Sequence, residues 1–157
     1  MRAIILAGLL LFMAAPVLAA DQDIPKSKGV SSKEAYELSE KCAKFAAEKF
    51  KQGFTQEGCK REEDGMYCST YSNHYSPKLN KCFMLIRTMY HPKDKDAGVG
   101  NMKSVLDIHE NREIATLYVD QKANFNWKTL DCRVQDQDCK SESEWDVLVK
   151  PYMEDEN

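Results

Sequence analysis

The sequence lacks the short motifs that identify several classes of enzyme and metal-binding protein. It contains no C-x-x-C pair, no C-x-x-C-H haem attachment motif, no H-E-x-x-H zinc pair, no G-x-S-x-G nucleophile elbow and no phosphate-binding loop. Its three histidines do not stand at the i, i+4 spacing that lets two imidazoles on a helix bind one zinc ion. We therefore expect neither a metal nor a cofactor, and a binding function is favoured over a catalytic one.

The chain also lacks an excess of positive charge. It has 22 Lys and Arg against 25 Asp and Glu, a formal net charge of −3. Nucleic-acid binding requires clustered basic residues that neutralise phosphates, and no basic stripe is present. Beyond the N-terminal segment, the longest apolar run is residues 82–86, far short of the ~20 residues needed to cross a bilayer. We therefore expect no nucleic-acid partner and no membrane span in the mature chain.

The N-terminal segment, residues 1–20, has the composition of a secretory signal peptide. Arg2 provides a basic start, an apolar centre follows, and Val17 and Ala19 are small residues at the exit. Cleavage is expected after Ala19 or Ala20, and a retained N-terminal anchor is the alternative. The exit is not followed by a cysteine, which argues against lipid anchoring. The sequence thus predicts a periplasmic or secreted protein.

Six cysteines, an even number in a chain expected to be exported, predict a disulfide framework. Their number leaves the connectivity open, so the pairs are hypotheses from the order of the predicted elements. Cys42 lies on the apolar face of a predicted helix and Cys82 begins the most apolar strand, so we expect a bridge between them. Cys132 and Cys139 are close in sequence and are expected to form a local bridge. Cys59 and Cys68 are then left as the third pair.

Residues 31–157 are expected to form a single domain after a flexible leader at residues 21–30. An antiparallel sheet of four to five strands is predicted within it. Residues 81–90 are apolar on both faces, which predicts a central strand that is covered on both sides. The other strands are expected at 66–75, 105–108, 114–119 and 127–134, with loops at 54–65, 91–102 and between Cys132 and Cys139.

Two amphipathic helices complete the predicted fold. The first covers residues 32–52, and its apolar stripe from Leu38 to Phe45 is expected to lie across the sheet. The second is short and begins at Ser141 and Glu144, which have capping-box spacing. Pro151 lacks a backbone donor, so this helix is expected to kink or fray there. The fold class is α+β, with the N-terminal helix packed on the sheet, a short C-terminal helix and disulfide staples.

The predicted hairpin resembles a motif of an uncharacterised family of small exported bacterial proteins. The resemblance rests on residues 73–83, in which Tyr-x-x-Lys-Leu-Asn-Lys-Cys-Phe is the distinctive string. It extends to the helix around Cys42, to Cys132 and Cys139 and to residues 145–153, and so covers most of the mature chain. It implies a bacterial envelope location and disulfide bonds. It brings no known activity and no site residues.

The tyrosines of the first long strand are the main candidate binding residues. Tyr67, Tyr71 and Tyr75 fall on one face of this strand. If exposed, together with the neighbouring His74, they would form an aromatic platform for a protein, peptide or glycan partner. The alternative is that they pack beneath the long helix, and the tendency of aromatic rings to be buried favours it.

A catalytic alternative is a small periplasmic hydrolase built around His74 and carboxylates distant in sequence. It requires a pocket that brings these groups within hydrogen-bond reach. Asp107, Glu110 and Glu113 cluster at a predicted hairpin tip, where solvent disfavours acid–base catalysis. Two acidic segments are candidates for cation binding that are better explained as solvated turns: residues 62–64, and Asp136 with Asp138.

Together these features favour a non-catalytic exported module that binds an envelope protein or a small ligand, as an inhibitor or accessory subunit. The hydrolase remains an alternative. A structural component of an envelope assembly is the other, and it predicts self-association of the domain.

Overall fold

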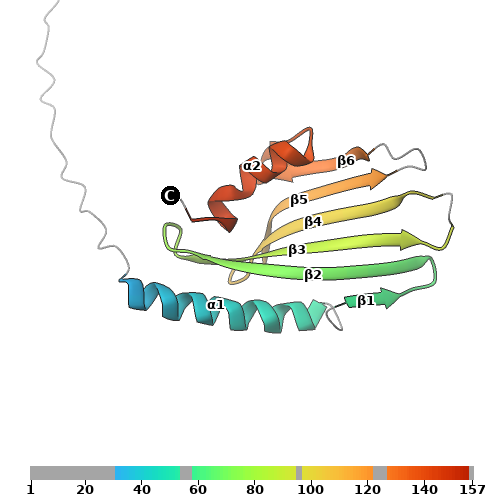
Figure 1. Cartoon of the computed structure of the whole chain (residues 1–157). Helices are drawn as coiled ribbons and strands as arrows, with labels where there is room; N and C mark the ends of the chain where they lie inside the picture. The colour runs from blue at the N-terminus through green and yellow to red at the C-terminus, as the bar shows by residue number, and fades with distance from the viewer. Residues whose placement is uncertain (1–30, 54–57, 95–96, 122–126, 156–157) are drawn as a thin grey trace, which may run out of the picture.

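A computed structural model of the chain describes residues 31–53, 58–94, 97–121 and 127–155 (Figure 1). The predicted signal peptide and leader lie outside these residues. The described chain forms two helices and one sheet. The elements in chain order are α1 (Ser32–Gly53), β1 (Gly58–Arg61), β2 (Gly65–Ser76), β3 (Lys81–Pro92), β4 (Val99–Asp107), β5 (Arg112–Gln121), β6 (Trp127–Val134), β7 (Gln137–Asp138) and α2 (Glu142–Met153).

The sheet is an antiparallel meander in which each strand pairs with the next, in the order β1 to β7. The α+β class and the two helices agree with the sequence-based prediction. The strand number does not, because seven strands replace the expected four to five. The two extra strands, β1 and β7, are short edge strands whose side chains are all exposed. They carry no apolar alternation, so their segments resembled loops.

β4 is also longer than predicted, since it begins at Val99 inside a segment expected to be a loop. Glycines at positions 98 and 100 suggested that loop. In the structure, however, Gly100 pairs with Tyr90 of β3 and with Asp120 of β5. Flanking strands on both sides therefore hold a glycine-bearing segment in the sheet.

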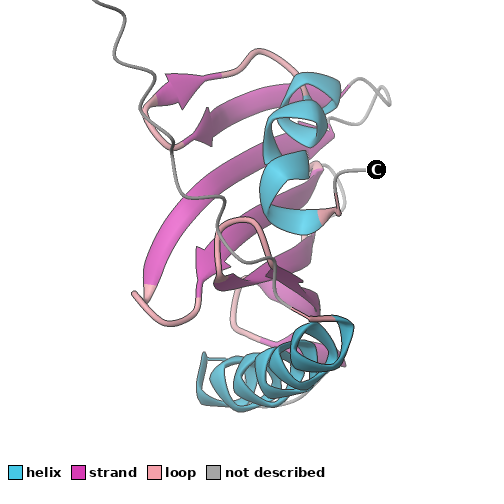
Figure 2. Cartoon of the chain, turned by 90° about the vertical axis from the view of Figure 1, so that its left-hand side faces the viewer, coloured by secondary structure: helices cyan, strands magenta, loops and turns pink. Residues whose placement is uncertain are grey.

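The two helices cover opposite faces of the sheet, here called the α1 face and the α2 face (Figures 1 and 2). The central strand β3 confirms the expected burial on both sides. Its Met84 and Ile86 pack with α1, whereas Phe83 and Leu85 belong to the core beneath α2. That core is the larger one and includes Trp145 of α2.

α1 is placed differently from the prediction, because it runs along β2 and β3 instead of across the sheet (Figure 1). Its buried residues are Cys42, Ala46 and Phe50, which follow one another at i, i+4 and i+8. Phe45 lies off this stripe and is 47% exposed, with its ring against that of His109. The short helix α2 is the one that spans the sheet, from β2 to β6.

Three disulfides join the elements, and they are the three pairs expected from the sequence. Cys42–Cys82 joins α1 to β3, Cys59–Cys68 joins β1 to β2, and Cys132–Cys139 closes the hairpin before α2. Among the described residues, neither helix is long and apolar enough to cross a bilayer.

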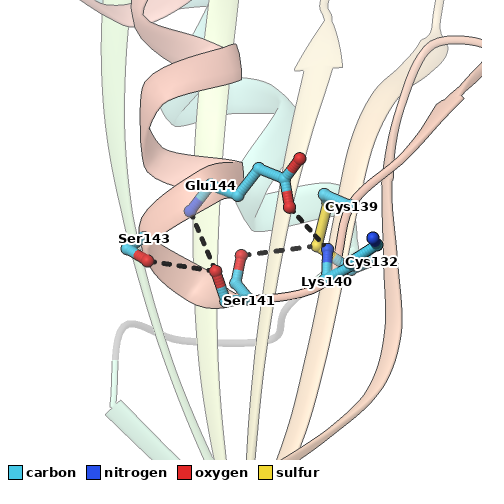
Figure 3. Close-up of a disulfide and its surroundings, with 6 residues drawn as sticks. All are labelled: Cys132, Cys139, Lys140, Ser141, Ser143 and Glu144. Atoms are coloured by element: carbon cyan, nitrogen blue, oxygen red, sulfur yellow. Dashed lines mark hydrogen bonds between the residues drawn. A yellow bond between two sulfur atoms is a disulfide. The ribbon is translucent and has the colours of Figure 1, made fainter.

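The start of α2 shows how the last disulfide and the helix cap are combined (Figure 3). Ser141 Oγ accepts a hydrogen bond from the Glu144 backbone N–H at 3.2 Å, as the capping-box spacing predicts. The Glu144 carboxylate accepts from the backbone N–H of Lys140, directly after Cys139, at 2.9 Å. The helix continues through Pro151 and ends at Met153.

Candidate binding site on the α1 face

α1 covers β2 and β3 from Tyr75 to Tyr71, and among the described residues no helix covers the rest of this face, here called the open half of the α1 face. Near the end of α1, the Phe50 ring packs on Tyr71 of β2, with centroids 4.6 Å apart. Beyond Tyr71, the next cross-strand row on this face consists of Ser69, Thr88 and Met102. The row after it pairs Tyr67 with Tyr90, and Tyr90 with Gly100. α1 ends at Gly53, shortly after the Phe50 contact with Tyr71. The two rows after Tyr71 therefore lie beyond the end of the helix.

A cavity of about 550 Å³ lies over the first of these rows; we call it the α1-face cavity. Its volume is within the range of small-molecule sites. A smaller hollow of about 230 Å³ adjoins it and shares Tyr67, Thr88 and Met102. The lining residues of the α1-face cavity come from the end of α1, from β1 and from the sheet: Gly53, Gly58, Cys59, Lys60, Arg61, Glu62, Tyr67, Ser69, Thr88 and Met102.

Short polar side chains contribute to the cavity lining where the sheet is not covered by the helix. Ser69 and Thr88 are buried, and their hydroxyl oxygens lie 2.9 Å apart in a mutual hydrogen bond. One hydroxyl donates its hydrogen to the other. The accepting hydroxyl retains its own hydrogen, so the pair has one O–H donor left for a ligand.

Tyr67 and Tyr90 form an aromatic wall next to this hydroxyl pair. Their rings stack with centroids 4.6 Å apart. The Tyr67 hydroxyl donates to Asp64 Oδ2 at 2.8 Å, and the Tyr90 hydroxyl donates to the Asp64 backbone carbonyl at 3.1 Å. The hydroxyls therefore point to Asp64, and the ring surfaces are left for contact with a ligand.

The same contacts raise the pKa of both tyrosines. The hydrogen bond to Asp64, reinforced by partial desolvation and by the negative charge of that carboxylate, raises the pKa of Tyr67 to about 12. Desolvation, followed by the Asp64 charge, raises the pKa of Tyr90. Both hydroxyls therefore keep their protons to a higher pH than an ordinary tyrosine does.

Two glycines allow the tyrosine rings to lie close to the backbone. A Cβ atom on Gly65 would stand 2.6 Å from the Tyr90 ring and 2.5 Å from the His91 carbonyl oxygen. A Cβ atom on Gly100 would stand 3.1 Å from the ring and hydroxyl of Tyr118. Glycine within a strand commonly marks such a close approach. The open half of the α1 face is therefore shaped by specific packing.

Charge at the α1-face cavity is confined to its rim. Lys60, which pairs with Tyr67 across the strands, forms an exposed ion pair of 2.6 Å with Glu62. The other charged lining residue, Arg61, is also exposed. The buried polar groups of the lining are the neutral hydroxyls of Ser69 and Thr88. This arrangement favours an uncharged ligand, because no buried charge is present to offset the desolvation of an ion.

The four residues suggested from the sequence do not form one platform. Tyr71 and Tyr75 lie beneath α1, where Tyr75 is buried beside the Cys42–Cys82 bridge. Tyr67 alone of the three lies beyond the helix. His74 pairs with Phe83 and so belongs to the opposite face of the sheet. The sequence analysis missed Ser69, Thr88 and Met102 of the α1-face cavity and Tyr90, Gly100 and Tyr118 of the adjoining hollow.

Among the described residues, His74 has the carboxylate of Asp155 within reach and no hydroxyl partner. Its Nε2 lies 3.6 Å from Oδ1 of Asp155, an exposed residue beyond the end of α2. That Nε2 is buried and makes no hydrogen bond among the described residues. The nearby Ser76 hydroxyl accepts instead from the Leu79 N–H at 3.4 Å. Within the described ranges, no hydroxyl is hydrogen-bonded to His74, the contact that a nucleophile–base pair requires.

The carboxylates of the hairpin tip have structural contacts. Asp107 is fully buried, binds Lys81 Nζ at 2.7 Å and accepts from the backbone N–H groups of His109 and Glu110. Burial opposes ionisation, but the Lys81 and backbone hydrogen bonds outweigh it and lower the pKa of Asp107. Glu110 pairs with Lys81 and Arg112. This cluster holds the turn between β4 and β5.

In the described parts of the chain, no cluster of three or more His, Cys, Asp or Glu side chains is placed to hold a metal ion. No protein-family model, curated protein or solved structure matches the chain. The geometry of the α1 face is therefore the basis for a functional proposal.

Proposed function

We propose that the protein is a non-catalytic, exported binding module and that the α1-face cavity is its ligand site. The observation that carries this proposal is a cavity lined by Tyr67, whose ring stacks on Tyr90 of the adjoining hollow while Asp64 engages both hydroxyls. Export is supported by the signal-like residues 1–20 and by the three disulfides, which are typical of oxidising compartments.

The proposed ligand is uncharged, contains a planar aromatic ring and carries a hydrogen-bond acceptor. The ring would contact Tyr67 and Met102. The acceptor would take the O–H that the Ser69–Thr88 pair leaves available. This chemistry is found in free aromatic amides and ketones and in an aromatic side chain of a protein partner, next to its backbone carbonyl.

Nuclear magnetic resonance titration of the oxidised mature chain tests the proposal. The probes are acetanilide for a free ligand and N-acetyl-phenylalaninamide for a protein side chain. We expect at least one of them to shift the backbone resonances of Ser69, Thr88 and Met102. 4-Acetamidobenzoate, which adds a carboxylate, and methyl β-D-glucopyranoside, which lacks the aromatic ring, are expected to bind more weakly.

Two variants assign the binding to the cavity. Tyr67→Ala removes the aromatic wall and is expected to weaken probe binding by about three- to tenfold, the range of one aromatic contact. Tyr36→Ala is the matched control, because Tyr36 is an exposed tyrosine on α1 that does not line the cavity. Absence of any shift at the cavity residues with both probes, or equal loss in the two variants, would overturn the proposal.

A further inference from the structure

β1 is a thin part of the wall of the α1-face cavity. All four of its residues are exposed, and it pairs with β2 at the edge of the sheet. Gly58, Cys59, Lys60 and Arg61 nevertheless all line the cavity. A four-residue edge strand with no buried side chain has little intrinsic stability. The cavity therefore depends on whatever holds β1 in place.

The Cys59–Cys68 disulfide is the covalent link between β1 and the sheet. The two cysteines are direct partners across the strands. Cys59 is exposed and Cys68 is half-buried. The other two bridges are shielded, since Cys42 and Cys82 are 2% and 1% exposed and Cys132 and Cys139 are 6% and 9% exposed. A thiolate in solution thus reaches the Cys59–Cys68 bridge more readily than the others.

We propose that the Cys59–Cys68 bridge is a redox-sensitive element that controls the α1-face cavity, with a dithiol as the reductant. One thiolate of the dithiol attacks the exposed Cys59 Sγ, the Cys59–Cys68 bond breaks, and the Cys68 thiolate leaves and takes a proton. The second thiolate of the dithiol then displaces Cys59, which is protonated in turn. Two electrons pass to the protein, which gains two thiols, and the dithiol becomes a disulfide.

The reduced state loses the constraint that keeps β1 on β2. The four cross-strand residue pairs between β1 and β2 remain, and β1 contributes no buried side chain to them. β1 then separates from the sheet in a larger fraction of molecules, and the cavity loses the wall formed by residues 58–61. Ligand affinity falls in consequence. This inference rests on the proposed ligand site for its functional meaning, whereas the release of β1 stands independently of any ligand.

The first experiment measures the order of reduction. The oxidised mature chain is treated with increasing dithiothreitol, alkylated and mapped by peptide mass spectrometry. We expect Cys59 and Cys68 to be alkylated while Cys42, Cys82 and the C-terminal pair remain bridged. Reduction of another bridge first, or of all three together, would overturn the proposal.

The second experiment follows β1 itself. Backbone amide hydrogen exchange at Gly58 and Lys60, whose N–H groups face β2 in the antiparallel register, is compared between the oxidised chain, the selectively reduced chain and the C59S/C68S variant. We expect exchange at β1 to accelerate about tenfold or more in the last two, a change that corresponds to ~1.4 kcal/mol in local opening. β5 serves as the internal reference. Unchanged exchange at β1 would show that the disulfide does not control this strand.

Probe titration of the same three samples completes the test. The oxidised chain is expected to bind the acetanilide or phenylalaninamide probe more tightly than the reduced chain, and reoxidation is expected to restore the affinity. Accelerated exchange at β1 with no probe binding in any sample would contradict the proposed function alone. Equal probe affinity in oxidised and reduced chains would contradict the control of the cavity alone.

Discussion

The two helices cover their faces of the sheet to different extents. On the α2 face, Trp145 and Val149 of the helix join Val105, Leu117 and Cys132 of the sheet in one continuous buried cluster. On the α1 face, the packing of the helix stops at the tilted ring pair of Phe50 and Tyr71, and beyond it the α1-face cavity lies over the buried hydroxyl pair of Ser69 and Thr88. The α2 face holds the larger buried core, whereas the part of the α1 face beyond the helix presents aromatic rings and hydroxyls next to a cavity.

Lys103 illustrates how α2 engages the part of the sheet that it covers, whereas Arg87 and Met89 of the same face lie beyond the helix and are exposed. Lys103 bonds Glu142 at 2.7 Å and Asp146 at 3.1 Å, and its Nζ lies over the Trp145 ring. A charged side chain of the sheet is thus engaged by the first turns of the helix. In contrast, the Ser69–Thr88 hydroxyl pair on the α1 face faces a cavity. The contrast directs mutational tests of stability to one face and of binding to the other.

The largest effect is expected from breaking the core of the α2 face at Trp145. Trp145→Ala removes a side chain that is 1% exposed and is expected to lower the free energy of unfolding by about 3–5 kcal/mol. Urea denaturation followed by circular dichroism measures this loss. Val147→Ala on the exposed side of the same helix is the control, with little expected change. Equal effects of the two variants would remove the distinction between the faces.

A smaller effect is expected at Asp107, which lies at the end of the α2 face. Asp107→Ala leaves Lys81 and two backbone N–H groups without their acceptor. We expect it to lower the free energy of unfolding by about 1–3 kcal/mol. Glu113→Ala, at an exposed carboxylate of the same hairpin, is the matched control.

The same residue predicts a pH dependence. Because the pKa of Asp107 is lowered on folding, its contribution is complete above the ordinary carboxyl pKa of about 4 and is lost as the pH falls through the lowered value. Wild-type stability is therefore expected to fall more steeply than that of Asp107→Ala between neutral and strongly acidic pH. Urea midpoints across this range measure the difference, and parallel pH profiles would contradict it.

The smallest effect on stability is expected on the open half of the α1 face, at Asp64. Asp64→Asn removes the charge that holds the Tyr67 hydroxyl, so the pKa of Tyr67 is expected to fall from about 12 toward the ordinary value of about 10. Carbon-13 resonances of the tyrosine ring measure it. Because folding raises this pKa, the associated stabilisation is present below about pH 10 and is lost as the pH rises through the raised value.

Glu62→Gln is the control for this titration, since Glu62 contributes less to the Tyr67 pKa than Asp64 does. The urea midpoint of Asp64→Asn at neutral pH is expected to stay close to that of the wild type. A large fall in that midpoint would show that the tyrosine wall belongs to the stabilising core, and the comparison between the faces would fail.

Local sequence patterns predicted the elements whose signals are strong. The helix over 32–52, the strand over 81–90 and the segment 127–134 all lie within one to two residues of the observed elements, because capping residues and apolar periodicity mark them. β1 was missed since its stability depends on a partner strand and a disulfide. The cavity was missed for a related reason, because its residues come from β1 to β4 and have no shared motif.

The sequence by itself determined that the chain forms cysteine bridges, that one strand is buried on both sides and that Tyr67, Tyr71 and Tyr75 share one strand face. Only the tertiary structure decided which of these tyrosines is left uncovered. From Cys42 to Phe50, α1 advances about 12 Å, and from Tyr75 to Tyr71, β2 advances about 13 Å. The helix therefore lies alongside β2 from Tyr75 to Tyr71. It ends at Gly53, and Tyr67 lies beyond its end.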